Sequence, residues 1–65
     1  MTNYYIKKET YGTMFPHIIN EKIMNQARHE KNELDANDYV FYCKADNIRE
    51  AEERYSEEFS YLFLF

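Results

Sequence analysis

Few side chains in this sequence have the type and spacing needed for metal binding or nucleophilic catalysis. His17, His29 and Cys43 are the residues that could bind a metal or supply a nucleophile. A zinc site needs three or four ligands at paired spacings, and the chain has no CxxC and no HxxxH pattern. The histidines fit surface positions, and Cys43 lies in an aromatic run, where cysteine is usually a small buried hydrophobic residue rather than an activated thiolate.

Other catalytic patterns are also missing from the sequence. A single glycine excludes a Gly-rich phosphate-binding loop. Carboxylates are abundant, but they fall on the polar face of a predicted helix, where charge usually serves solvation. We therefore expect a protein that is not an enzyme, with no catalytic residue, no cofactor and no metal ligand.

The most informative polar feature is a row of carboxylates. Residues 1–44 carry equal numbers of acidic and basic side chains, so the net charge of −4 lies entirely in residues 45–65. On a helix, Glu50, Glu53 and Glu57 fall within about 60° of one another and rise by about 4.5–6 Å per step, loosely comparable with a phosphate backbone. With the acids around them, the candidate partner-binding residues are Asp46, Glu50, Glu53, Glu57 and Glu58.

This row has two interpretations. It could imitate nucleic acid and occupy a basic nucleic-acid-binding groove of a host protein, with electrostatic attraction speeding the encounter. Taken alone, the row fits better with an ordinary solvated helix face. The acid excess argues against direct binding of nucleic acid, which depends on basic side chains that release counterions.

The last residues are a second candidate surface. Continued as a helix, they would place apolar side chains on its polar side and leave an exposed hydrophobic patch. We expect them to form a short buried strand, to fold back onto the sheet as an extended tail, or to contact a second copy in a homodimer. These docking or dimer residues are Tyr61, Leu62, Phe63, Leu64 and Phe65.

A third possibility is a platform on which single-stranded nucleic acid stacks. Aromatic and lysine side chains on adjacent strands can form one. The alternative is that the tyrosines are half-buried sheet residues beside solvated lysines. The residues concerned are Tyr4, Tyr5 and Tyr42 with Lys7, Lys8 and Lys44.

Four elements would position these residues. A strand is predicted at about 3–10, where β-forming residues alternate, and Gly12 marks the break after it. A helix is predicted from Phe15 to Leu34, because Phe15, Ile19, Ile23 and Ala27 recur at four-residue spacing. The turn residues 35–38 end this helix.

The second half of the chain repeats the pattern. Residues 39–45 form the clearest strand, with Tyr39, Phe41 and Cys43 expected on one face and the intervening residues on the other. Asn47 and Glu50 are expected to form a capping box at the start of a second helix, with Asp46 as the alternative cap. Glu50 and Arg54 should pair on this helix. The predicted fold is a small α+β domain of β-α-β-α order, its sheet of two or three strands packed against two helices.

Composition limits what this domain can be. Sixty-five residues make one domain, 1–65, which buries only about 60% of its unfolded surface. Seven tyrosines and five phenylalanines supply core mass. One cysteine excludes an internal disulfide and favours a reducing compartment. We expect no signal peptide and no membrane segment.

The segment YVFYCKADNIREAEERY, residues 39–55, resembles the strand-to-helix segment of many small phage proteins. The short length, acid excess and Tyr/Asn/Lys/Glu-rich usage also resemble proteins encoded by phages of low-GC Gram-positive bacteria, whose small acidic members include anti-CRISPR proteins. The resemblance implies a cytoplasmic inhibitor of a host defence nuclease. A small regulatory or scaffold protein that docks a partner through its aromatic tail is the alternative.

Overall fold

The computed structural model describes residues 1–30 and 34–63. Its three strands and two helices confirm the predicted α+β class. Short 3-10 turns at Lys8–Thr10, Ala36–Asp38 and Ser60–Phe63 connect or follow them. The elements in chain order are β1 (Thr2–Lys7), β2 (Ile18–Asn20), α1 (Glu21–Glu30), β3 (Tyr39–Ala45) and α2 (Ile48–Glu58).

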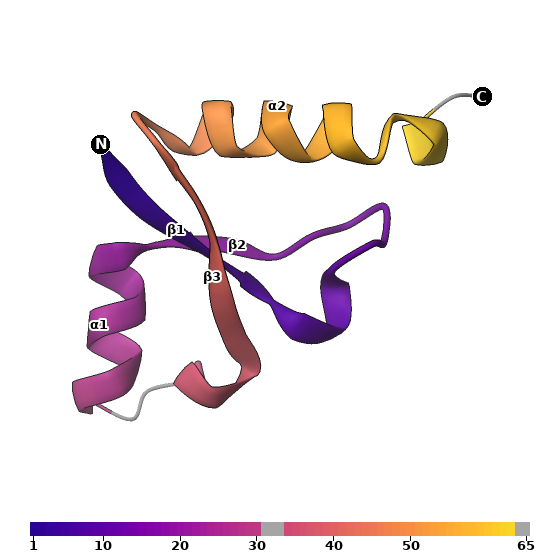
Figure 1. The fold of residues 1–65 in the computed structure, drawn as a ribbon. Helices are drawn as coiled ribbons and strands as arrows, with labels where there is room; N and C mark the ends of the chain where they lie inside the picture. Colours follow the sequence, from indigo (N-terminus) through magenta and orange to yellow (C-terminus); the bar gives the residue numbers. More distant parts are fainter. Residues whose placement is uncertain (31–33, 64–65) are drawn as a thin grey trace.

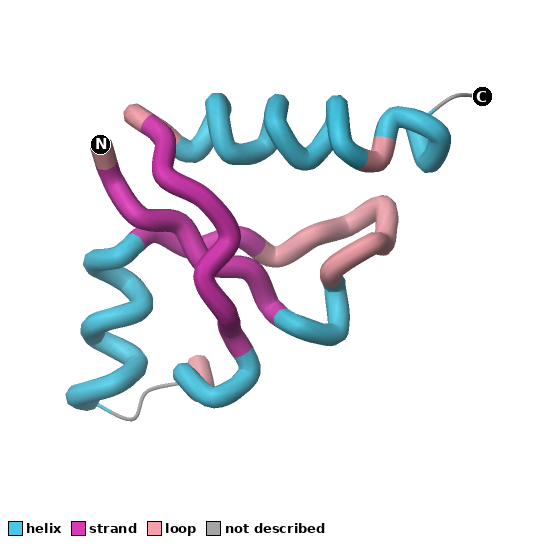
Figure 2. Tube along the Cα trace, viewed as in Figure 1, coloured by secondary structure: helices cyan, strands magenta, loops and turns pink. Residues whose placement is uncertain are grey.

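The strands form one antiparallel sheet in the order β2-β1-β3 (Figure 2). β1 lies in the centre, with Ile6 opposite Ile18 on one side and Val40 on the other. Three consecutive residues of β1 are almost fully buried, with exposed fractions of 5% for Tyr4, 8% for Tyr5 and 1% for Ile6. Since successive side chains of a strand point to opposite faces, both faces of the sheet must be covered.

The two helices provide this cover, one on each face (Figure 1). On one face, Tyr4 packs with Ala51 of α2 and with side chains of β3. On the other, Tyr5 packs with Met24 of α1 and with Ile19 of β2. The core therefore consists of two clusters, separated by the sheet.

α2 is the element closest to its sequence prediction. Asn47 caps it, because its Oδ1 accepts the Glu50 N–H at 3.0 Å. The Glu50 carboxylate accepts the N–H of Asp46, the residue before the cap, at 3.1 Å, so it bonds this residue rather than Asn47 itself. The expected Glu50–Arg54 pair is wrong, since Lys7 and Glu9 form the one ion pair within 4 Å that the described residues show.

The predicted start of the first helix is also wrong. α1 begins at Glu21, and Ile18–Asn20 form β2 instead. β-branched Ile18 and Ile19 pair with β1, and Asn20 ends the strand by accepting the Ile23 N–H at 2.8 Å, a helix cap. Phe15, which had seemed to begin the apolar stripe, is 83% exposed. The helix is described to Glu30, and residues 31–33 lie outside the described part. Leu34, its expected last residue, lies in a bend rather than in the helix, so this predicted end is wrong.

The third strand therefore lies before α1, not after α2. Residues 60–63, where a short strand was one alternative, form a 3-10 turn. β1 covers 2–7 rather than 3–10, because residues 8–10 turn away from the sheet. Gly12 follows with φ of +85°, a conformation that favours glycine.

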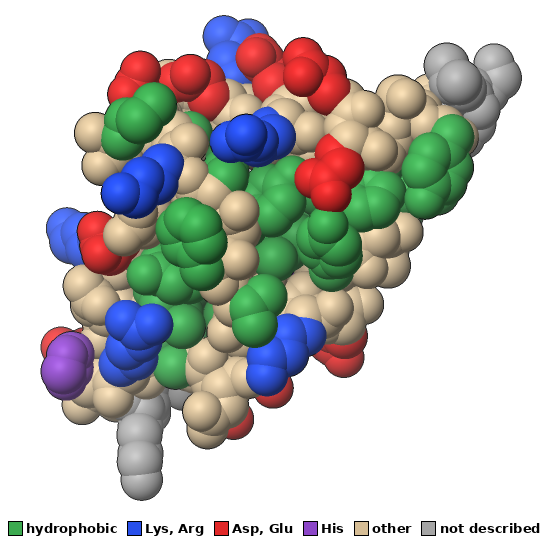
Figure 3. Space-filling model, viewed as in Figure 1, with side chains coloured by type: hydrophobic (Ala, Val, Ile, Leu, Met, Phe, Trp, Pro, Cys, Tyr) green, Lys and Arg blue, Asp and Glu red, His purple; other side chains and the backbone are tan. Residues whose placement is uncertain are grey.

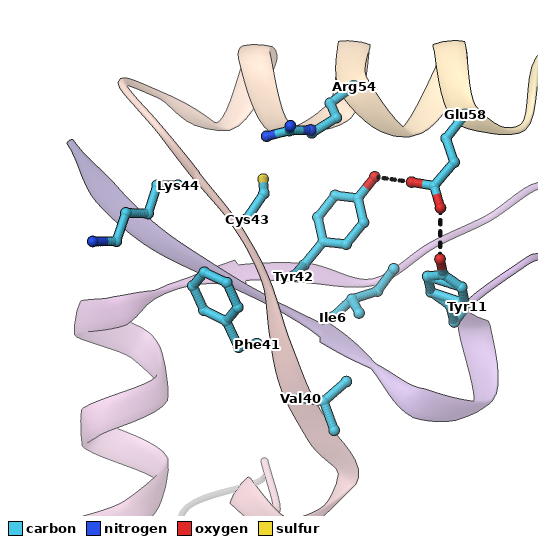
Figure 4. Close-up of a pocket in the computed structure, with 9 residues that line it drawn as sticks. All are labelled: Ile6, Tyr11, Val40, Phe41, Tyr42, Cys43, Lys44, Arg54 and Glu58. Atoms are coloured by element: carbon cyan, nitrogen blue, oxygen red, sulfur yellow. Dashed lines mark hydrogen bonds between the residues drawn. The ribbon is translucent and has the colours of Figure 1, made fainter.

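β3 contains a bulge that the alternating pattern did not predict. Tyr4 lies opposite Cys43 but Tyr5 lies opposite Phe41, so Tyr42 is an extra residue. Tyr39 and Phe41 share a face as expected, but Cys43 lies on the opposite face with Tyr4, so its predicted position is wrong. Beyond the bulge the faces are exchanged, and Tyr42 and Cys43 both point toward α2, as Figure 4 shows.

Tyr55 holds α2 against the rest of the domain. Its side chain is 1% exposed, and its hydroxyl donates a hydrogen bond to the Thr13 carbonyl. The Thr10 carbonyl lies 3.4 Å from the same hydroxyl. A residue of α2 thus bonds a loop more than 40 positions earlier in the chain, between β1 and β2.

We expect Tyr55→Phe to lower the free energy of unfolding by about 1 kcal/mol, because the Thr13 carbonyl loses its donor. Tyr55→Ala should cost about 3–5 kcal/mol, because it also leaves a cavity. Urea unfolding measures both. Tyr61→Phe is the matched control, because Tyr61 is 66% exposed, and it should leave stability unchanged. Equal effects of Tyr55→Phe and Tyr61→Phe would contradict this role.

Candidate interaction surfaces

The outward face of α2 carries the central residues of the predicted acidic row. Glu53 and Glu57 are exposed and lie on the side of the helix opposite buried Ala51 and Tyr55. The space-filling view shows acidic side chains along the edge of the molecule formed by α2 (Figure 3). No carboxylate of this row lies within 4 Å of a cationic group, as far as the described residues show.

The start of the row lies at the N-terminus of α2 and has a structural role. Glu50 is exposed, but one of its carboxylate oxygens accepts the Asp46 N–H. The Asp46 side chain is exposed just before the helix. Glu50 therefore has two roles: one carboxylate oxygen bonds the backbone at the start of α2, and its charge is also exposed to a partner.

Glu58 does not belong to the row. Its two carboxylate oxygens accept hydrogen bonds from the Tyr11 hydroxyl at 2.6 Å and the Tyr42 hydroxyl at 3.1 Å (Figure 4). Burial and the bond to Glu58 raise the pKa of Tyr42 well above its ordinary value. The same carboxylate raises the pKa of Tyr11. Glu58 thus links α2 to β3 and to the loop after β1, and its role in partner binding stays a prediction.

A groove separates the free edge of β3 from α2, with a volume of about 490 Å³. Its lining is mostly apolar along β3, where Val40 and Phe41 are exposed, and charged along α2. A second depression continues beyond Arg54 and is bordered by the glutamate row. The lining residues of the first groove are Ile6, Tyr11, Val40, Phe41, Tyr42, Cys43, Lys44, Arg54 and Glu58 (Figure 4).

The aromatic tail is described to Phe63, so Leu64 and Phe65 lie outside the described residues. Leu62 and Phe63 are half-buried, whereas Tyr61 is 66% exposed. The ring of Tyr61 contacts that of Phe59, with 6.2 Å between centroids. The tail thus begins packed beside the end of α2, and a homodimer contact through it stays a prediction.

The tyrosines of the proposed stacking platform lie inside the protein. Tyr4 and Tyr5 are buried on opposite faces of the sheet, and Tyr42 is half-buried against Glu58. The faces of these rings are therefore not available to bases. Lys8 and Lys44 are exposed, but no exposed tyrosine of the set accompanies them.

The histidines and the cysteine occupy separate places. His17 Nδ1 lies 2.7 Å from the Tyr39 hydroxyl, and His29 is exposed on α1. Cys43 is 5% exposed in the cluster with Tyr4. Within residues 1–30 and 34–63, no three His, Cys, Asp or Glu side chains gather as a metal site, and no helix is long and apolar enough to span a membrane.

Comparison of the chain with models of protein families, with curated proteins and with solved structures found no significant match.

The sequence pointed to the acids through their helical spacing alone. It missed the bonds to Glu58 and the groove, because both join residues that are distant in the chain. The excess of tyrosine was the one signal of a polar aromatic cluster.

We expect stability to fall above about pH 10, where tyrosines of the unfolded chain ionise. Because the pKa of Tyr42 is higher in the folded protein, folding favours the protonated side chain, and this stability is lost as the pH rises toward the folded pKa. Tyr42→Phe should make the fall shallower, while Tyr11, Tyr39 and Lys7, whose pKa values are also raised, contribute to the remainder.

Urea unfolding between about pH 8 and 11 measures this dependence, which lies around the tyrosine pKa. Tyr61→Phe serves as the control and should retain the slope of the parent protein. A Tyr42→Phe protein whose stability falls as steeply as that of the parent would show that Tyr42 does not carry the effect.

Proposed function

We propose that this protein is a non-catalytic inhibitor that binds the basic nucleic-acid-binding surface of a host defence nuclease, such as a CRISPR effector. The binding face is the outward side of α2, with Glu53 and Glu57 at its centre and Glu50 and Asp46 at its N-terminal end. The observation that carries the proposal is the exposure of these carboxylates in one row, without a cationic partner among the described residues.

Electrostatics supports this role. A row of unpaired carboxylates on a rigid helix attracts a basic groove over distances of about one Debye length, near 8–10 Å at moderate salt. The row is held rigidly, because Tyr55 and Glu58 attach α2 to the sheet and the loop. Complementary charge mainly speeds association and excludes wrong partners. The protein would therefore compete with nucleic acid for entry to the groove.

The phage resemblance of residues 39–55 points in the same direction. A small protein without a catalytic group can stop a nuclease by denying it its substrate. The exposed Glu53 and Glu57 provide charge for this task, while buried Ala51 and Tyr55 keep the opposite side of the helix in the core. The glutamate row and the core thus use different sides of one helix.

We expect a variant with Glu50→Gln, Glu53→Gln and Glu57→Gln to lose at least about tenfold in affinity for its nuclease, because the row loses its charge. Glutamine retains a side-chain acceptor at position 50, so the helix cap survives. The matched control is Glu30→Gln, Asp38→Asn and Glu52→Gln, which removes the same charge from other exposed positions.

The assay measures DNA cleavage by a panel of CRISPR nucleases, with the protein added before or after guide and target DNA. The proposal predicts inhibition only when the protein precedes the DNA, and weaker inhibition at higher salt. Inhibition by the triple variant equal to that of the parent would refute binding through this face. No inhibition of any nuclease would refute the nuclease as target.

A further inference from the structure

The free edge of β3 is the longest strand edge that the described residues leave unpaired. β3 pairs with β1 on one side only, and it has seven residues where β2, the strand at the other edge, has three. Such an edge presents unpaired backbone N–H and C=O groups, to which another strand can bond. Proteins usually protect an edge with charge or proline, and β3 has Lys44 as its one charged residue and no proline. The edge is therefore open to a further strand.

Apolar side chains of β3 are exposed on both faces of the sheet. Val40 is 42% exposed and Phe41 is 54% exposed, and these consecutive residues point to opposite faces. A partner lying on one face could cover only one of them, whereas a strand added beside β3 covers both. Figure 3 shows this side of the molecule, with apolar side chains in the middle and charged side chains of both signs around them.

The mixture of charges beside the edge favours a partner that carries the same mixture. Arg54 shares the groove with Glu58, and it shares the neighbouring depression with the glutamates of the row. Lys44 borders both depressions, and Arg28 lies on the face covered by α1. Asp38 is exposed just before the strand. A partner of one charge would meet repulsion as well as attraction, whereas a second copy of this surface brings both signs.

The ends of β3 are complementary to those of its own copy in the antiparallel direction. Asp38 precedes the strand and Lys44 lies near its end, so antiparallel pairing brings the acid of each copy to the lysine of the other, twice by symmetry. Both side chains are exposed, and neither forms an ion pair among the described residues. A parallel arrangement in the same register would bring like charges together instead.

The faces of β3 limit the register of such a pair. Residues directly opposite each other share a face, so Val40 of one copy cannot lie opposite Phe41 of the other. A two-fold axis at Phe41 meets this condition, because Phe41 then lies opposite its own copy, and Val40 lies opposite Tyr42 on the face of α2. The apolar Val40 of each copy would enter the groove of the other. Asp38 and Lys44, three positions on either side of Phe41, come together at both ends.

We propose that two copies of this protein pair antiparallel through the free edge of β3, about a two-fold axis at Phe41, and form one six-stranded sheet. Because this pairing preserves the faces of the sheet, both α2 helices would lie on the same side. The added burial stabilises a domain that is too small for a large core. The interface is distinct from the aromatic tail, whose residues 60–63 follow the end of α2, and it does not rest on the function proposed for the glutamate row.

Charge reversal tests the pairing, measured by sedimentation at up to about 1 mM protein, where a weak dimer is populated. Asp38→Lys alone sets lysine against lysine, and Lys44→Glu alone sets acid against acid. Each variant should therefore associate with itself at least about tenfold more weakly than the parent. An equimolar mixture of the two variants should dimerise like the parent, because both opposite-charge pairs are then restored.

The matched controls are Glu52→Lys and Arg49→Glu, which make the same charge changes at exposed positions of α2 outside both depressions. Each control should dimerise like the parent, alone and in the mixture. Circular dichroism checks that all variants fold. In the parent protein, amide hydrogen exchange within β3 should slow as the concentration rises and the dimer forms.

Three outcomes would overturn the proposal. The first is a parent protein that stays monomeric at the highest concentration. The second is a dimer whose β3 amides exchange as fast as in the monomer, or whose two charge variants do not prefer each other. The third is a dimer that both charge variants retain and that is lost when residues 61–65 are removed, which would assign the contact to the aromatic tail. Because these experiments contain no nuclease, their failure leaves the function proposed for the glutamate row intact.

Discussion

Attachment of α2 to the sheet through Tyr55 is the interaction on which the rest of this structure depends. The phenol is almost fully buried, and its hydroxyl bonds the loop between β1 and β2. Neighbouring rings enclose it, with centroid distances of 4.7 Å to Phe59, 6.1 Å to Tyr42 and 6.4 Å to Tyr11. In a domain too small for a deep core, aromatic rings supply large buried areas with few rotatable bonds. Their polar tips also give this cluster hydrogen bonds, which fix its geometry.

Both candidate surfaces depend on this attachment. The glutamate row is a rigid feature only while α2 lies on the sheet, and the groove exists only because α2 and β3 lie beside each other. Glu58 links the two elements, because it accepts the Tyr42 hydroxyl from β3 and the Tyr11 hydroxyl from the loop. The bulge in β3 makes this possible by turning Tyr42 toward the helix. One cluster of tyrosines thus positions an acidic face on one side of α2 and, on another side, a groove with apolar and charged lining residues.

Local signals predicted the elements whose boundaries are set locally. β3 and α2 were recognised because a β-branched and aromatic run precedes an asparagine cap, and both features act over a few residues. β2 was missed because the spacing of Phe15, Ile19 and Ile23 fits a helix equally well. Pairing of Ile18 and Ile19 with β1, across a loop, decided in favour of a strand. Pairing with β1 therefore outweighed the four-residue spacing, which corresponds to a helix only from Glu21 onward.

The candidate site was predictable to a similar extent. Helical spacing correctly placed Glu50, Glu53 and Glu57 on the exposed side of α2. It could not show that Glu58 turns toward tyrosines 16 and 47 positions earlier in the chain. Nor could it show the groove, whose lining comes from both halves of the sequence and depends on a bulge that no turn residue announces. Long-range hydrogen bonds and strand register decide these features.

Native-state amide hydrogen exchange tests the central claim, the attachment of α2, most directly. Because Tyr55 and Glu58 join α2 to the sheet, amides in the middle of α2 should exchange with the same opening free energy as those of β1, through global unfolding. This would show that the helix and the sheet unfold as one unit. α2 amides that exchange at a much lower opening free energy, while β1 stays protected, would contradict the account. The helix would then detach alone, and neither surface would be held in place.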